Sequence, residues 1–262
     1  MTPREGLTTV DSEIIALAED EYAAAAESAR IEVREIHTAA EAAEAALLLD
    51  EVWSVDETGT NVLEPGLIVA FAHAGNYVSA AYSLDEPDEM IGVTIGFFGQ
   101  PLGTVMHSHI AGVRHQVIGR GAGSAMKLHQ RLWCLNLGIT EMTWTFDPLV
   151  ARNAYFNFQR LGVGMVEYLE DFYGQMRDGV NAGQASDRMV VSWPLDKPPG
   201  PPSPRRTMPS NVCAVTTTVN RWSPRCPRRP VWSPSTFPPT SRRCAATMPI
   251  SPHGGGRHCV TR

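Results

Sequence analysis

Three strand-like segments in quick succession constrain the fold of this chain more than any other feature of its sequence. They span residues 77–84, 90–98 and 104–113, and all three are rich in β-branched, aromatic or other apolar residues. The connections "DEPDE" and "GQPLG" between them have the composition of turns. Strand-like segments joined by such short turns are typical of an antiparallel meander, which we therefore predict here.

A glycine-rich loop follows the meander and opens a helix. Glycines stand at 119, 121 and 123, and a helical pattern runs from about residue 124 to 137, where Gly138 ends it. Elsewhere the pattern predicts helices over 10–29, 39–53, 65–75 and 148–162, and strands over 31–36, 140–146, 163–169 and 188–193. This order of elements indicates a mixed α/β sheet and not a repeating βαβ array.

The charge of the chain divides sharply near residue 195. Residues 1–195 contain 11 Lys and Arg against 27 Asp and Glu, a net charge of −16, whereas 196–262 contain 11 basic residues and one acid, a net charge of +10. Binding to a phosphate backbone needs a basic face, so the acidic body argues against nucleic acid as its main partner. We expect no membrane span and no signal peptide, because no long apolar run or basic leader is present. With one cysteine in the body, we predict a cytoplasmic protein.

Residues 196–262 differ in kind from the body, 1–195. They hold 14 of the 20 prolines, with many Arg, Ser and Thr and almost no apolar periodicity. This composition is typical of a disordered basic tail. The same residue types also arise when GC-rich codons are translated out of frame, and we favour this second hypothesis. The coding DNA, translated in all three frames, tests it.

The glycine loop is a candidate anion site. A helix N-terminus presents unpaired N–H groups and the positive end of the helix dipole, so a phosphate binds there if the backbone is accessible. Gly119, Gly121 and Gly123 provide that access, and Arg120 adds a cation. The alternative is a plain turn with Ser124 as the helix cap. The Walker pattern is absent, and the dinucleotide pattern G-x-G-x-x-G fails at its third glycine.

His107 and His109 lie two residues apart in the predicted strand 104–113, so their side chains share one face of it. Three hypotheses are open. The first is that they are satisfied polar side chains on a partly buried sheet. The second is a metal site, which would need a third ligand from His115, His129 or an acid; no tight cluster indicates one, and we predict no metal. The third, which we favour, is that a histidine is the general base that takes a proton from an attacking amine.

These segments together resemble the GNAT N-acetyltransferases over about residues 30–193. The acyl-CoA loop motif of that family, [RQ]-x-x-G-x-[GA], is similar to Ile118, Gly121 and Gly123, and "RNAYFNFQRLG" resembles its later N-x-x-x-x-[FY]-x-x-x-G region. The resemblance implies an α/β fold with a mixed, mostly antiparallel sheet flanked by helices, and acetyl-CoA or another acyl-CoA as co-substrate. It implies that the co-substrate binds Val113, Gly119, Arg120, Gly121, Ala122, Gly123, Ser124 and Asn153.

The histidine strand resembles the H-x-H-x-x-x-V segment of the arylalkylamine N-acetyltransferases, which implies that His107 and His109 are catalytic. The strand backbone around residues 110 and 111 would then stabilise the thioester oxyanion. One position departs from the family: Phe158 stands where many members carry the tyrosine that protonates the leaving thiolate. Phenylalanine has no proton to give, so Tyr155 one helical turn earlier, or water, is the alternative donor.

The implied function is transfer of an acyl group from acyl-CoA to an amine, on a small molecule or on a protein, by direct attack. The alternative from another class is a non-catalytic CoA-binding sensor or partner-binding module, and Phe158 is its support. A third hypothesis is a damaged product whose altered tail removes a region needed for folding or activity. The sequence leaves open the amine, the acyl length, the general acid and the oligomeric state, a homodimer included.

Overall fold

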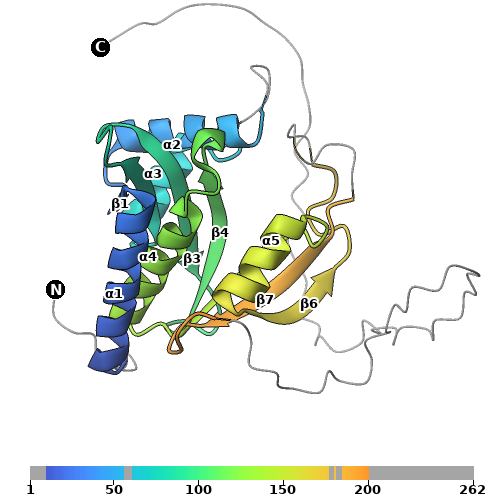
Figure 1. Cartoon of the computed structure of the whole chain (residues 1–262). Coiled ribbons are helices and arrows are strands. Elements are labelled where there is room, and N and C mark those ends of the chain that lie inside the picture. The colour runs from blue at the N-terminus through green and yellow to red at the C-terminus, as the bar shows by residue number, and fades with distance from the viewer. Residues whose placement is uncertain (1–9, 56–60, 177–179, 181–184, 201–262) are drawn as a thin grey trace, which may run out of the picture. The chain divides into compact units, whose positions relative to one another are not determined.

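The computed structural model describes residues 10–55, 61–176, 180 and 185–200 of the 262-residue chain (Figure 1). The chain divides into two units, Met1–Thr207 and Met208–Arg262, and the second unit lies outside the described residues. The predictions made for the tail therefore lie outside the described residues from 201 onward. Within the described part, no helix has the length and the apolar composition that crossing a bilayer requires.

Seven strands form one mixed sheet in the described residues. Their spatial order is β1 (Ile31–Glu35), β2 (Val78–Ser83), β3 (Met90–Phe98), β4 (Val105–Val113), β5 (Glu141–Phe146), β7 (Arg188–Pro194) and β6 (Gly164–Leu169). Every neighbouring pair is antiparallel except β4 and β5, which are parallel. Strands β2 to β4 are the predicted meander, and the whole is a mixed, mostly antiparallel sheet flanked by helices, as the sequence predicts.

Helices cover both faces of this sheet (Figure 1). They are α1 (Ser12–Ala29), α2 (Ala39–Val52), α3 (Pro65–His73), α4 (Ala122–Asn136) and α5 (Ala151–Tyr155), which continues as a π-helix, Phe156–Leu161. Helices α1 and α4 lie side by side on one face, and α2 and α3 lie on the other. Successive residues of β2 show the two layers, because Ala80 packs in the cluster of α2 and α3 whereas Ala81 packs in that of α1 and α4.

Local sequence explains where two of these helices begin. Thr38 and Glu41 form a capping box on α2, in which the side chain of each residue accepts a hydrogen bond from the backbone N–H of the other. Helix α3 starts with Pro65 at its first turn, where the missing N–H costs nothing because no intrahelical partner exists there. Helix α3 lies on the face of the sheet that carries the two histidines, because its Phe71 stacks with Phe97 of β3, against which both histidine rings lie.

The sheet splits between β4 and β5, and this split positions the candidate site. The two strands pair only over Val105–His107 and Glu141–Thr143. Beyond these residues β4 follows β3, whereas β5 follows β7. The backbone of β4 from Ser108 to Val113 therefore has no paired strand on its β5 side among the described residues. An open strand edge of this kind can hydrogen-bond an extended ligand.

Candidate functional site

The glycine loop leads directly into α4, two residues earlier than the sequence pattern predicted. Gly121 is the N-cap residue, with φ 95° and ψ −7°, and Gly119 has φ 85°. Side chains with a Cβ rarely adopt such left-handed conformations, so glycine is needed at both positions for the turn itself. No side chain of the described residues caps the helix. The alternative that Ser124 is the N-cap is wrong, because Ser124 lies in the first turn and its N–H donates to the Gly121 carbonyl at 2.9 Å.

Gly123 has neither a conformational nor a packing reason to be glycine. Its φ is not positive, and a Cβ added there would meet nothing within 4 Å. Glycine inside a helix costs roughly 0.5–1 kcal/mol relative to alanine. The same space lies open beside Gly119, whereas a Cβ at Gly121 would come within 3.6 Å of Ala29. The loop thus keeps open space over the first turn of α4, where the amide groups point outward.

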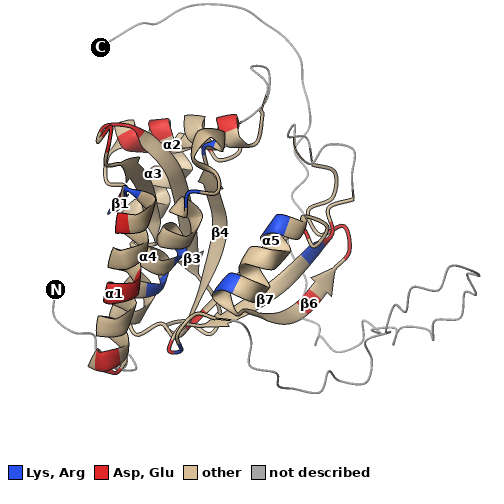
Figure 2. Ribbon diagram, viewed as in Figure 1, with Lys and Arg blue, Asp and Glu red and all other residues tan. Residues whose placement is uncertain are grey.

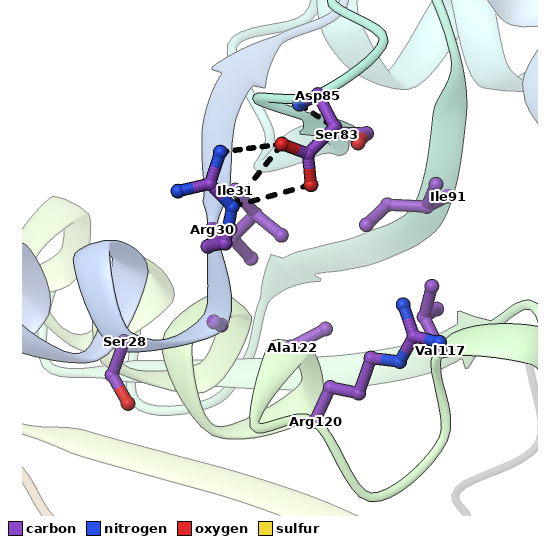
Figure 3. A pocket seen from close by; sticks show the side chains of 10 residues that line it. Ser28, Arg30, Ile31, Ser83, Asp85, Ile91, Val117, Arg120 and Ala122 are labelled. Atoms are coloured by element: carbon purple, nitrogen blue, oxygen red, sulfur yellow. Dashed lines mark hydrogen bonds and ion pairs between the residues drawn. The ribbon is translucent and has the colours of Figure 1, made fainter.

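A shallow cavity of about 290 Å³ lies beside the loop (Figure 3). It is formed by the end of α1, the end of β2 and the loop itself, and its lining includes Arg30, Asp85, Arg120 and Ala122. Arg30 and Asp85 form an exposed ion pair, which the figure marks with dashed lines. Arg120 lies across the cavity from that pair. The acidic residues in contrast line the outer surfaces of α1 and α2 (Figure 2), so the loop presents positive charge on an otherwise acidic body.

The predicted co-substrate residue Val113 ends β4 just before the loop. It pairs with Gly92 of β3 and its half-buried side chain packs in the α1–α4 cluster, so its backbone belongs to the open edge described above. Ala122 is buried and Ser124 half-buried in the first turn of α4. The open edge of β4, the loop and the helix start therefore follow one another directly along the chain, and within this stretch Gly112 and Ala122 are buried. Asn153 lies on α5, half-buried, away from this stretch in sequence and in element.

The two histidines share a face of the sheet, as the sequence predicted. Both rings lie against Phe97 of β3, with centroid distances of 5.2 Å for His107 and 5.7 Å for His109. A β-bulge produces part of this arrangement: Ser108 pairs with Gly96 and Ile110 with Ile95, so His109 is the extra residue of β4. The bulge lies at the point where β4 leaves β5.

The environments of the two rings differ. His107 is half-buried and its Nδ1 lies 3.2 Å from the hydroxyl of Thr143 on β5. Burial, with smaller contributions from His109 and Lys127, lowers the pKa of His107 to about 4. His109 is more exposed, and partial burial lowers its pKa as well. Both rings are therefore neutral at pH 7 and able to accept a proton.

No group of three His, Cys, Asp or Glu side chains in the described residues could hold a metal ion. His129, which the metal hypothesis considered as a third ligand, is on α4 and faces the other layer. Its Nδ1 lies 2.7 Å from the hydroxyl of Tyr77. His115 is exposed in the short 3₁₀ turn His115–Val117 after β4.

Phe158, which stands where many members of the family that the sequence resembles carry a tyrosine, lies in a packed environment after β5. The ring of Phe158, in the π-helix, lies edge-on to Phe146 with centroids 6.0 Å apart. Tyr155, the alternative donor, is 60% exposed at the end of α5. The neighbouring Asn157 is buried and accepts a hydrogen bond from the Trp144 indole at 3.3 Å. A π-helical turn at this place changes which side chains face the sheet.

A buried polar cluster on α4 is not predicted by the sequence pattern. Lys127, Gln130 and Arg131 all lie on its sheet-facing side and are at most 6% exposed. Arg131 donates to Glu21 of α1 and to the carbonyls of Leu195 and Lys197, and so ties the end of β7 to both helices. Lys127 reaches β4. The signal was present, because these residues recur at helical spacing, but a polar stripe more often faces solvent.

The likeness of this chain to known proteins lies in its backbone fold and not in its sequence. No protein-family model matches the chain, and no curated protein sequence matches it. Similar solved structures include a GNAT-family acetyltransferase from Streptococcus pneumoniae, at 13% identity over 62% of this chain and 97% of that one, with a TM-score of 0.49. The putative acetyltransferase yncA from Salmonella typhimurium with its cofactor acetyl-CoA is similar at 16% identity over 66% and 98%, with a TM-score of 0.47. A Bacillus subtilis acetyltransferase in complex with CoA is similar at 14% identity over 63% and 97%, with a TM-score of 0.43.

Proposed function

We propose that this chain is an acyltransferase that moves an acetyl or other acyl group from acyl-CoA to an amine. The observation that carries the proposal is the accessible backbone at the start of α4, and above all the open space at Gly123. A glycine without a structural reason, at a helix N-terminus without a cap, is accounted for by an anionic ligand that approaches the backbone closely. The pyrophosphate of CoA is such a ligand, with Arg120 beside it.

The rest of the co-substrate then follows the open edge of β4. Its amide-containing arm pairs with the strand backbone from Val113 toward Ser108, as an added strand would. This direction brings the thioester to the β-bulge, beside His109. The N–H groups of the backbone near Ile110 and Ala111 are the proposed donors to the thioester oxygen when it becomes an oxyanion.

The reaction needs a base for the attacking amine. We assign this role to His109, which is the more exposed of the pair, with His107 packed beside it on Phe97. The amine attacks the thioester carbon, a histidine accepts its proton directly or through water, and the carbon–sulfur bond breaks to release CoA. Asn153 remains a proposed contact of the co-substrate. The acceptor is an amine of a small molecule or of a protein.

The test is titration calorimetry of the full chain with acetyl-CoA, beside the Gly123→Ala variant. We expect the variant to bind about 10-fold or more weakly, since loss of one hydrogen bond to a charged group costs about 1.5–3 kcal/mol. Gly164→Ala is the matched control, because Gly164 lies in β6 and its added Cβ would make only an ordinary contact at 3.9 Å. Equal affinity of all three proteins, or no binding, would reject the proposal.

The second candidate is a CoA-binding module without turnover. It is favoured by one observation, the packed Phe158 at the position of the family's proton donor. Release of free thiol from acetyl-CoA in the presence of a panel of primary amines separates the two functions. An acyltransferase releases thiol with at least one amine class, whereas a sensor binds acetyl-CoA and releases none.

A further inference from the structure

Lys127 is a buried cation without an anionic partner. The residue is 6% exposed, and no carboxylate of the described residues forms an ion pair with it. Its Nζ donates to the Ser108 hydroxyl at 2.6 Å and to Gln130 Oε1 at 3.1 Å. For the third N–H, the described residues offer only weak acceptors: Met142 Sδ lies at 3.8 Å, and the Trp144 ring centroid at 4.2 Å. Burying an ammonium ion without a paired charge costs folding free energy, so a lysine at this position needs an explanation.

The ammonium group lies at the apex of the split between β4 and β5. The last paired residues are His107 and Thr143. Lys127 contacts the next residue on each strand, Ser108 and Trp144. It therefore lies on the α4 face of the sheet at the level where the histidines occupy the opposite face. This is also the end of the open β4 edge, to which the proposed function brings the thioester.

Lys127 is not needed to satisfy its neighbours. The Ser108 hydroxyl donates to Gln130 Oε1 at 2.9 Å independently of it. Burial lowers the pKa of Lys127 to about 7, so the side chain can release and regain a proton at neutral pH. Among the described residues, the titratable groups that interact with it are Cys134 on its own helix and His107 on β4; Cys134 raises the pKa of Lys127 by less than burial lowers it, and neither group is a carboxylate.

We propose that Lys127 faces the sulfur of the acyl donor and protonates the departing thiolate. The inference rests on the proposed function, and it supplies the proton donor that Phe158 cannot be. When the carbon–sulfur bond breaks, the sulfur takes the electron pair and then a proton from the Lys127 ammonium, which becomes a neutral amine. The histidine on the other face holds the proton taken from the attacking amine. The histidine then releases its proton to water and the Lys127 amine takes a proton from water, which restores the starting state.

The test follows the thiol of bound CoA, and so needs no acceptor amine. Ultraviolet absorbance of the thiolate is measured against pH for CoA bound to the full chain and to the Lys127→Met variant. A cation within about 4–6 Å lowers the pKa of an acidic group by about 1–3 units. Because the Lys127 ammonium and the thiolate stabilise each other, the thiolate on the wild type keeps Lys127 protonated, and we expect a lower thiol pKa there than on the variant. Lys197→Met is the matched control, because Lys197 is the only other lysine and is exposed.

The outcomes of these measurements separate failure of the Lys127 inference from failure of the proposed function. CoA binding with the same thiol pKa on wild type and Lys127→Met overturns this inference and leaves the proposed function standing. No CoA binding to the wild type overturns both. In turnover assays with amines, Lys127→Met should lose about 10²–10⁴-fold in kcat with acetyl-CoA affinity retained. An acyl adduct on Lys127, detected by mass spectrometry after incubation with acetyl-CoA, would also overturn the inference, because an acylated nitrogen is an amide and no longer carries an ammonium proton to give.

Discussion

Replacement of Lys127 by methionine should stabilise the folded chain, and the gain should depend on pH. The side chain is buried, and its pKa falls from 10.5 to about 7. Each unit corresponds to about 1.4 kcal/mol of preference for the neutral form, so the buried ammonium costs on the order of 5 kcal/mol below pH 7. Methionine has a similar length and no charge, and the Ser108–Gln130 hydrogen bond remains in the variant.

The sign follows from proton binding in the two states. Between the folded pKa of about 7 and the ordinary value of 10.5, the unfolded chain keeps the Lys127 proton while the folded chain has released it. The stability contributed by this group therefore rises with pH across that window. The Lys127→Met variant lacks this titration, so its advantage over the wild type should be largest below pH 7 and should shrink toward pH 10.

Urea unfolding of wild type, Lys127→Met and Lys197→Met at about pH 6, 8 and 9.5 measures the effect. We expect the Lys127→Met curve to converge on the wild type as pH rises, and the Lys197→Met curve to follow the wild type throughout. A Lys127→Met variant that is less stable at every pH, or that differs from the wild type by a constant amount, would refute the reasoning. It would mean that the ammonium group is stabilised by its neighbours and not penalised by burial.

Two further substitutions test other parts of the site and its support. His109→Gln should lower kcat for thiol release by about 10²–10⁴-fold and leave acetyl-CoA affinity unchanged, because the ring accepts a proton but does not hold the co-substrate; calorimetry and a thiol assay together check this. Arg131→Met should destabilise the chain by about 3–5 kcal/mol in chemical unfolding, because it leaves the Glu21 carboxylate and two carbonyls without their donor. A loss below 1 kcal/mol would show that the link between α4 and the end of β7 is dispensable.

The sheet could be predicted well because its strands are joined locally. Short turns fix the meander β2 to β4, and the alternation of apolar residues gives each strand its faces. The sequence pattern predicts the start of α4 two residues late, because Ser124 is of a residue type that commonly caps helices. The structure instead uses the left-handed Gly121, which leaves the end of the helix uncapped. A glycine cap and a glycine turn have the same appearance in a single sequence.

The histidine pair could be placed on one face from spacing alone, but its setting could not. A bulge depends on the register between β3 and β4, which no local pattern encodes. Lys127 was missed for a related reason. A helix with a stripe of Leu128, Leu132 and Leu135 suggests that the leucines face the sheet, yet Leu128 and Leu132 are only half-buried and the Lys127 side is buried. Tertiary contacts with Ser108 and Trp144 decide this orientation.

The split sheet also has a mechanical consequence. Strands β1 to β4 and β5 to β7 are two antiparallel blocks that share three residue pairs, and the chain passes from one block to the other once, through the segment that contains α4. Any molecule that binds along the unpaired edge of β4 and also contacts β5 would link the two blocks across their boundary. Part of its binding energy then becomes cohesion between the blocks. We therefore expect binding of such a molecule to slow hydrogen exchange in the strands on both sides of this boundary.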